Sequence, residues 1–192
     1  MKHIKSKKLL VTIIIVSVVI MLIIGYFIGI KIQKDMYPIK YNEYVVKYSE
    51  EYNVPQDLIY AVIRTESSFD EKANSSAGAV GLMQIMPDTF DWISKHMDES
   101  YAEGAIYQPE SNIKCGTFYL SYLYEKFGNW DTALAGYNAG HGRVAEWLSD
   151  TRYTDDGITL KNIPYTETNN YVIKVNKAKE MYINLYFDDS SN

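Results

Sequence analysis

A long apolar run lies near the N-terminus of the chain. Leu9–Ile30 contains 22 consecutive residues without a charge. As a helix with a rise of about 1.5 Å per residue, this run extends about 33 Å, enough to cross a hydrocarbon core of about 30 Å. The alternative is the buried core helix of a soluble protein. A run of this length that is apolar on every side favours a transmembrane helix.

A cleaved signal peptide is the second alternative for the same run. Such a peptide has a short apolar core followed by small residues at its cleavage site. The first alanine of this chain is Ala61, and no lipid-accepting cysteine follows the apolar run. We therefore expect an uncleaved anchor at 9–30. Four lysines precede it, which places residues 1–8 in the cytoplasm and the domain after the anchor outside the membrane.

After the anchor, apolar residues recur mostly at helical spacing, with a linker expected at 31–40 and a polar tail at 188–192. Between them, prolines and glycines indicate where the helices of one domain at 41–187 begin and end. The predicted helices are 41–52, Pro55–Phe69, Pro87–Met97, Pro109–Phe127, Trp130–Asn138, one around Val144–Leu148, and one from Thr166 or Glu167 to Leu185. No clear run alternates with period two, so the predicted fold class is mainly α.

The charge distribution excludes one class of partner. Residues 1–40 hold seven lysines and one aspartate, a net charge of +6, whereas residues 41–192 hold 12 basic and 23 acidic residues, a net charge of −11. Nucleic acid requires clustered Lys and Arg, so an acidic domain of this kind is not expected to bind it. The single cysteine, Cys115, cannot form an intramolecular disulfide and is expected in the core. The three histidines are scattered, so we predict neither a metal site nor a cofactor.

One carboxylate lies on the apolar face of a predicted helix. In the helix that begins at Pro55, Val62 and Thr65 point inward, and Glu66 lies on the same face. Burial raises the pKa of a carboxyl group, and a raised pKa suits a general acid near neutral pH. The alternative is a glutamate at the edge of the apolar stripe that pairs with a lysine or reaches solvent. The helix pattern alone leaves both interpretations open.

Two further segments have unusual compositions. Residues 74–84 read NSSAGAVGLMQ, and a segment rich in Gly, Ala and Ser gives a ligand close access to backbone groups. Residues 136–140 read GYNAG, with a tyrosine and an asparagine just before a helix end. Each segment on its own is equally compatible with an ordinary loop or a capped helix.

Taken in order, the segments resemble a known family. Glu66-Ser67, the run GAVGLMQIMP at 78–87, YNAG at 137–140 and IPYTET at 163–168 leading to Tyr171-Val172 resemble the ordered motifs of the lytic transglycosylases of the soluble, glycoside hydrolase family 23 type, which are related to goose-type lysozyme. The resemblance covers about residues 41–187. Gly136 stands where the family usually has alanine, and Asn169 where arginine is common.

The resemblance implies a lysozyme-like fold with a sugar-binding cleft. Members of the family cleave the β-1,4 bond between N-acetylmuramic acid and N-acetylglucosamine in peptidoglycan. Glu66 would protonate the glycosidic oxygen and then act as base on the muramic 6-hydroxyl, which closes onto C1 to give a 1,6-anhydro sugar. The substrate's acetamido group would stabilise the intermediate, as in the substrate-assisted exceptions to the two-carboxylate rule.

The resemblance also implies a set of residues that line the cleft. Tyr137 is expected to orient Glu66 or the scissile region, and Glu167 to contact polar groups of the sugar. Ser67 is expected on the helix surface, and Asp70 in a local polar contact rather than as a partner carboxylate. The implied substrate-binding residues are Ser75, Gln84, Met86, Tyr137, Asn138, Glu167 and Tyr171.

Three functions follow as hypotheses. The first is a membrane-anchored lytic transglycosylase whose partners are glycan strands and the membrane. The second is a goose-lysozyme-like muramidase that uses water in place of the 6-hydroxyl and needs another carboxylate to activate that water. The third is an inactive wall-binding scaffold of an envelope complex. The sequence names no protein partner.

Overall fold

The computed structural model describes residues 2–187, so the predicted polar tail at 188–192 lies outside the described residues. The structure divides into two compact units, one that ends at Pro38 and one that begins at Ile39. Each unit is described by itself.

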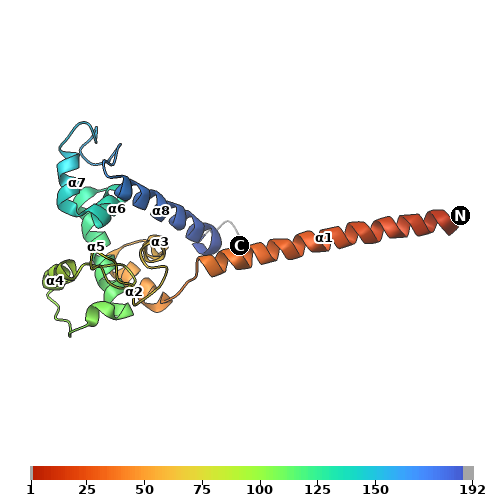
Figure 1. The fold of residues 1–192 in the computed structure, drawn as a ribbon, viewed down its shortest axis with the longest axis horizontal. Helices are drawn as coiled ribbons and strands as arrows, with labels where there is room; N and C mark the ends of the chain where they lie inside the picture. The colour runs from red at the N-terminus through yellow and green to blue at the C-terminus, as the bar shows by residue number, and fades with distance from the viewer. Residues whose placement is uncertain (1, 188–192) are drawn as a thin grey trace. The chain divides into compact units, whose positions relative to one another are not determined.

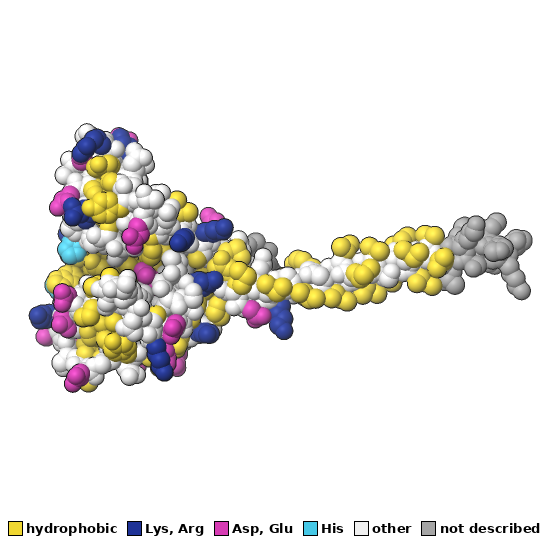
Figure 2. Space-filling view, viewed as in Figure 1, with side chains coloured by type: hydrophobic (Ala, Val, Ile, Leu, Met, Phe, Trp, Pro, Cys, Tyr) yellow, Lys and Arg dark blue, Asp and Glu magenta, His cyan; other side chains and the backbone are white. Residues whose placement is uncertain are grey.

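The first unit is a single helix, α1 (Lys2–Met36). Within its segment Leu10–Met36, a stretch of 18 residues has a mean hydropathy of 3.0 with none of it buried, and hydrophobic side chains line much of the helix in Figure 2. By length and composition this helix can cross a membrane. It also continues through residues 31–36 of the predicted linker, which leaves only residues 37–41 outside the helices.

The second unit is helical, as predicted, and no strand forms among residues 39–187 (Figure 1). Three isolated bridges, two of them in the segment 74–85, are its β-type pairings in the described residues. The helices are α2 (Asn42–Tyr52), α3 (Gln56–Glu66), α4 (Pro87–His96), the 3₁₀-helix η1 (Ala105–Tyr107), α5 (Pro109–Phe127), α6 (Trp130–Ala139), α7 (His141–Leu148), α8 (Thr166–Tyr182) and the π-helix η2 (Ile183–Phe187).

The core of this unit is built around α3. All six residues from Leu58 to Ile63 are buried, so this helix has no solvent-facing side along its middle. It packs most extensively on α8 and also contacts α2, while α6 packs on α5, α7 and α8. Because α3 is enclosed on all sides, its C-terminal end is held at a fixed place in the domain.

Local chemistry explains most of the helix boundaries. Pro87 and Pro109 occupy the first turns of α4 and α5, where the missing N–H costs nothing. Gly128 ends α5 in the left-handed conformation, with a φ of 70°. The side chain of Asn129 accepts a hydrogen bond from the Thr132 N–H at 3.0 Å and so caps α6.

The structure corrects the predicted end of α3, which was placed at Phe69. The helix ends at Glu66, because Ser68 and Phe69 adopt left-handed backbone angles with φ of 52° and 66°. Ser67 Oγ accepts a hydrogen bond from the Phe69 N–H at 3.1 Å within this turn. Asp70 therefore does not continue the helix beyond Glu66. The helices η1 and η2 were not predicted, and η2 replaces the last α-helical turn expected near Leu185.

A buried asparagine of α5 fixes the loop between α3 and α4. Asn112 is 1% exposed. Its Oδ1 accepts from the Met83 N–H at 2.7 Å, and its Nδ2 donates to the carbonyl oxygens of Val80 at 3.0 Å and Ile106 at 2.8 Å. A Cβ at Gly81, whose φ is 79°, would lie 2.5 Å from Asn112 Nδ2, so this close approach requires glycine.

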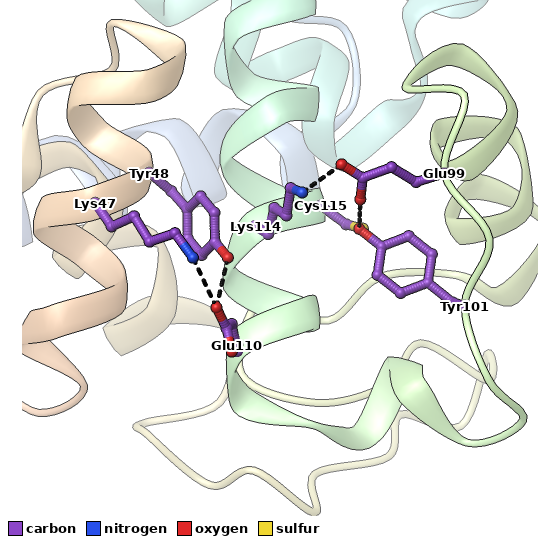
Figure 3. Close-up of polar contacts among 7 residues, drawn as sticks. All are labelled: Lys47, Tyr48, Glu99, Tyr101, Glu110, Lys114 and Cys115. Carbon is purple, nitrogen blue, oxygen red and sulfur yellow. Dashed lines mark hydrogen bonds and ion pairs between the residues drawn. The ribbon is translucent and has the colours of Figure 1, made fainter.

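Polar side chains fasten α2 and the segment after α4 to α5 (Figure 3). Glu110 accepts hydrogen bonds from Lys47 at 2.9 Å and from the Tyr48 hydroxyl at 2.8 Å. Lys114 pairs with Glu99 on the other side of α5. The exposed Lys47–Glu110 pair contributes about 0–1 kcal/mol, whereas the Lys114–Glu99 pair is partly buried.

The predicted core position of Cys115 is confirmed. This residue is buried, its Sγ donates to the Tyr101 hydroxyl at 3.6 Å, and burial raises the pKa of its thiol to about 11. The thiol is therefore protonated and unreactive near neutral pH.

Replacing Asn112 should destabilise the second unit. In Asn112→Ala, the buried Met83 N–H and Val80 carbonyl and the partly buried Ile106 carbonyl lose their partner, at about 1–3 kcal/mol for each buried unsatisfied group. We expect the free energy of unfolding, measured by urea denaturation, to fall by about 3 kcal/mol or more. The matched control is Asn129→Ala, which removes one helix cap and should cost about 1 kcal/mol. Equal losses in the two variants would contradict a special role for Asn112.

Candidate active site

The candidate site is centred on Glu66, the last residue of α3. The side chain is partly exposed, yet most of its surroundings are protein, and this desolvation raises the pKa of its carboxyl group to about 7. An interaction with Tyr171 acts in the opposite direction. Glu66 forms no ion pair within residues 39–187. The alternative in which this glutamate pairs with a lysine is therefore not what the structure shows.

Two tyrosines from different helices face this carboxyl group. Tyr137 of α6 donates from its hydroxyl to the Met83 carbonyl at 2.8 Å. The Tyr171 hydroxyl of α8 is buried and has no hydrogen bond of ordinary geometry among the described residues, although it lies close enough to Glu66 to lower the pKa of that carboxyl group. Burial, and secondly the charge of Glu66, raise the pKa of both phenols, so both remain protonated donors.

The loop before α4 brings its backbone up to the end of α3. Ser67, expected on the helix surface, donates from Oγ to the Leu82 carbonyl at 2.8 Å, which ties the residue after Glu66 to this loop. Gln84 has a φ of 49°, and its Nε2 donates to the carbonyls of Ala73 at 3.1 Å and Gly81 at 2.9 Å. The amide of Gln84 therefore holds the loop, and only its Oε1 remains as an acceptor for a ligand.

A cavity of about 210 Å³ lies beside Tyr137. It brings together four of the residues that the sequence placed in the cleft, Gln84, Met86, Tyr137 and Asn138, from the loop and from α6. Met86 is 41% exposed, so it presents an apolar side chain at the surface. The other lining residues are Ile85, Thr89, Tyr119, Ala139 and Gly140.

Three more predicted residues lie outside the lining of this cavity. Tyr171 faces Glu66 from α8, as described above. Ser75 is exposed, and its Oγ accepts from the Ala79 N–H at 2.9 Å, which closes a tight turn. Glu167 is exposed in the first turn of α8. Nearby, the Thr168 hydroxyl donates to Asn138 Oδ1 at 2.8 Å and so joins α8 to the cavity.

No second carboxylate shares the surroundings of Glu66 among the described residues. Asp70 is exposed, and its Oδ1 accepts from the Lys72 N–H at 2.9 Å, which is the local contact expected from the sequence. Glu71 accepts a hydrogen bond from the Tyr41 hydroxyl at 3.2 Å. Both are engaged in contacts of their own.

Sequence reasoning missed Tyr119 and Asn112. Tyr119 of α5 lines the cavity, and its ring lies 5.5 Å from that of Tyr137. Tyr119 and Asn112 lie on the inward face of α5 with Ile113 and Leu123. The signal that could have found them was therefore a polar group within an apolar stripe. Asn112 in particular is a buried amide, which needs partners for its polar atoms.

The helical fold and the desolvated Glu66 at its centre match what is expected of a lysozyme-like transglycosylase domain. The family Transglycosylase SLT domain matches residues 43–158, more than half of the chain. The chain belongs to this family.

Several known proteins are similar to the chain. The soluble lytic murein transglycosylase of Escherichia coli is 37% identical over 160 residues, which cover 81% of this chain and 25% of that protein. The membrane-bound lytic murein transglycosylase C of Serratia proteamaculans is 32% identical over 167 residues. The aligned region covers 74% of this chain and 46% of that protein. The structure of the 70 kDa soluble lytic transglycosylase of Escherichia coli has a TM-score of 0.71 at 36% identity. The match covers 82% of this chain and 26% of that protein. The chain thus spans about a quarter of the length of its soluble relatives.

The pKa of Glu66 predicts how stability depends on pH. An unfolded glutamate has a pKa of about 4.3, so between about pH 4.3 and pH 7 the folded state holds a proton that the unfolded state has lost. Stability should fall as the pH rises through this window. Glu66→Gln should therefore be more stable than the wild type by about 1–3 kcal/mol at about pH 8, with no gain at about pH 4.

Urea denaturation of both proteins at the two pH values measures this difference. Glu167→Gln is the matched control, because it removes a carboxylate of the same type from an exposed position. A gain for Glu66→Gln that is the same at both pH values would mean that desolvation of this carboxylate is not its source.

Proposed function

We propose that this protein is a membrane-anchored lytic transglycosylase of peptidoglycan. It would cleave the β-1,4 bond from N-acetylmuramic acid to N-acetylglucosamine and leave 1,6-anhydro-muramic ends, in cell-wall remodelling. The observation that carries the proposal is Glu66, one desolvated carboxyl group without a counter-ion or a second carboxylate among residues 39–187. Glu66 does not line the cavity itself, but its charge acts on Tyr137, which does.

The reaction needs a group that gives a proton and then takes one back. With a pKa of about 7, Glu66 is protonated in about half of the molecules at neutral pH and can donate to the glycosidic oxygen as the bond to C1 breaks. The resulting carboxylate then takes the proton of the 6-hydroxyl as that oxygen bonds to C1. The hydroxyl of Tyr171 is placed to stabilise the carboxylate between the two steps. Because the first step requires the acid form, turnover should decline as the pH rises through about 7.

The relatives support this assignment. Relatives that match the chain include proteins named soluble and membrane-bound lytic murein transglycosylases. One similar structure, from Pseudomonas aeruginosa, is of an inactive variant in which a glutamate is replaced by glutamine. Another is a complex of the 70 kDa soluble enzyme with bulgecin A, at a TM-score of 0.72. These are properties of longer proteins that share this domain.

The muramidase alternative requires a carboxylate that activates water. The nearest acids in sequence, Asp70 and Glu71, are already bound by Lys72 N–H and the Tyr41 hydroxyl, and neither affects the pKa of Glu66. The scaffold alternative gives no reason to keep a carboxyl group at a position where its ionisation destabilises the fold.

The products of the reaction test the proposal. Purified peptidoglycan treated with the full-length protein should release muropeptides with 1,6-anhydro ends, which lack one water molecule relative to hydrolytic products in mass spectrometry. Glu66→Gln should reduce release by at least about 100-fold, because its amide cannot exchange the proton. Reducing ends as the main product would assign the muramidase reaction, and full release by folded Glu66→Gln would exclude Glu66 as the acid.

The N-terminal helix supports the membrane part of the proposal. Its run from Leu10 to Ile30 carries no charge, and matching relatives include membrane-bound enzymes. The preceding lysines favour a cytoplasmic N-terminus and an extracytoplasmic catalytic domain. The segment 37–41 can extend at most about 18 Å, so the anchor would keep the domain close to the membrane and to newly made glycan.

Cell fractionation tests the anchor. We expect the full-length chain in the membrane fraction after high-salt and carbonate washes, because the association is hydrophobic. External protease should remove the domain from spheroplasts and leave a short membrane-bound fragment. A variant with Ile14, Val18 and Leu22 each replaced by Lys should lose membrane retention. A soluble chain that lacks residues 1–30 as the main species would mean that the segment is a cleaved signal.

A further inference from the structure

The cavity beside Tyr137 is small for a polymeric substrate. Its volume of about 210 Å³ is below the roughly 300–1,000 Å³ of pockets that hold drug-sized ligands. It therefore accommodates about one sugar unit. If the substrate is a glycan strand, as in the proposed function on which this inference rests, the next sugars must lie on the surface beside the cavity.

The surface on one side of the cavity is aromatic. In α4 and in α5, a residue that lines the cavity is followed one helical turn later by a large aromatic residue. At the start of α7, the last lining residue is followed directly by a histidine. The three pairs are Thr89 and Trp92, Tyr119 and Tyr122, and Gly140 and His141.

These aromatic residues form one contiguous group. We call Trp92, His96, Tyr122 and His141 the aromatic platform. The ring centroids of Trp92 lie 3.7 Å from His96 and 4.9 Å from Tyr122, and Tyr122 lies 6.1 Å from His141. Tyr119 joins the platform to the cavity, since its ring is 6.0 Å from Trp92 and its hydroxyl lies 3.3 Å from His141 Nδ1.

The platform is open to ligands. His96 is exposed, and the other three side chains are partly exposed. Within residues 39–187, the Trp92 indole N–H and the Tyr122 hydroxyl take part in no hydrogen bond, so both can bind a ligand. Partial burial, and secondly the charge of Lys126, lower the pKa of His141, which keeps its imidazole neutral at pH 7. Aromatic rings with polar groups at their edges match a pyranose, which has apolar C–H faces and polar hydroxyl and acetamido edges.

We propose that the aromatic platform is a further subsite that binds an N-acetylated sugar of the glycan strand next to the unit held in the cavity. The ring faces hold the sugar by stacking, and the Trp92 N–H and Tyr122 hydroxyl donate to its oxygen atoms. The platform thus selects strands that extend past the cavity over α4, α5 and α7.

Calorimetric titration of sugars of different lengths tests the subsite. The full-length protein in detergent, carrying Glu66→Gln to stop turnover, is titrated with N-acetylglucosamine and with the β-1,4-linked pentamer of this sugar. We expect Trp92→Ala and Tyr122→Ala each to weaken binding of the pentamer by about five- to tenfold. Binding of the monosaccharide, which fits the cavity, should change less than about twofold.

The chain provides a matched control in a second aromatic pair. Tyr124 and Trp130 stack at 4.1 Å between ring centroids and do not line the cavity, so Tyr124→Ala and Trp130→Ala should leave both affinities unchanged. Tyr122→Leu retains an apolar side chain, so it shows whether a loss of affinity in Tyr122→Ala comes from misfolding. It should also bind the pentamer more weakly. Unchanged pentamer binding in the platform variants, or an equal loss for the monosaccharide and the pentamer, would overturn the subsite.

Turnover separates this inference from the proposed function. If the wild type releases anhydro-muropeptides and the platform variants bind the pentamer normally, the subsite alone is wrong. If the wild type does not cleave peptidoglycan and binds neither the monosaccharide nor the pentamer, both proposals are wrong.

Discussion

The backbone of two consecutive residues, Leu82 and Met83, is the point at which three helices are joined. Ser67 at the end of α3 donates to the Leu82 carbonyl, Asn112 of α5 accepts from the Met83 N–H, and Tyr137 of α6 donates to the Met83 carbonyl. Each bond crosses at least 15 residues of sequence. The loop contains only isolated β-bridges, so side chains from the three helices provide hydrogen bonds that neighbouring strands would provide in a β-sheet.

The surroundings of Glu66 depend on this junction. Tyr137 can face the carboxyl group only while Met83 holds its hydroxyl, and Met83 is in place only while Asn112 occupies the space beside Gly81. Gly116 of α5 contributes by its size, because a Cβ there would overlap the Met83 side chain. The raised pKa of Glu66 is therefore a property of packing between elements and not of α3 alone.

Local chemistry made much of the fold predictable. The apolar anchor, the prolines that open α4 and α5 and the glycine that ends α5 are all visible in the sequence, because their effects act within one turn. The predicted end of α3 was wrong by three residues, because Ser68 and Phe69 adopt left-handed backbone angles where Ser67 donates to the Leu82 carbonyl of the loop. The sequence beside Glu66 does not show that Ser67 has this distant partner.

The site was predictable to the extent that its residues lie in recognisable motifs. Four of the expected residues line one cavity, and Tyr171 faces Glu66 from α8. Gln84 shows the limit of motif reasoning, since its amide donors turn out to hold the loop. Tyr119 and the aromatic platform belong to no quoted motif. Their function depends on three helices meeting, which a pattern along one helix does not reveal.

The arrangement implies a conflict between stability and reactivity. A glutamine or leucine at position 66 would suit a desolvated site better than a carboxyl group that ionises near pH 7. The domain places the Tyr171 hydroxyl, and not a lysine, beside this carboxyl group. The choice of neighbour determines whether Glu66 can hold a proton near neutral pH. A lysine would lower the pKa of Glu66 and leave it ionised, whereas a neutral donor tolerates both protonation states. A single group that must donate a proton and then recover it requires a neutral donor as its neighbour.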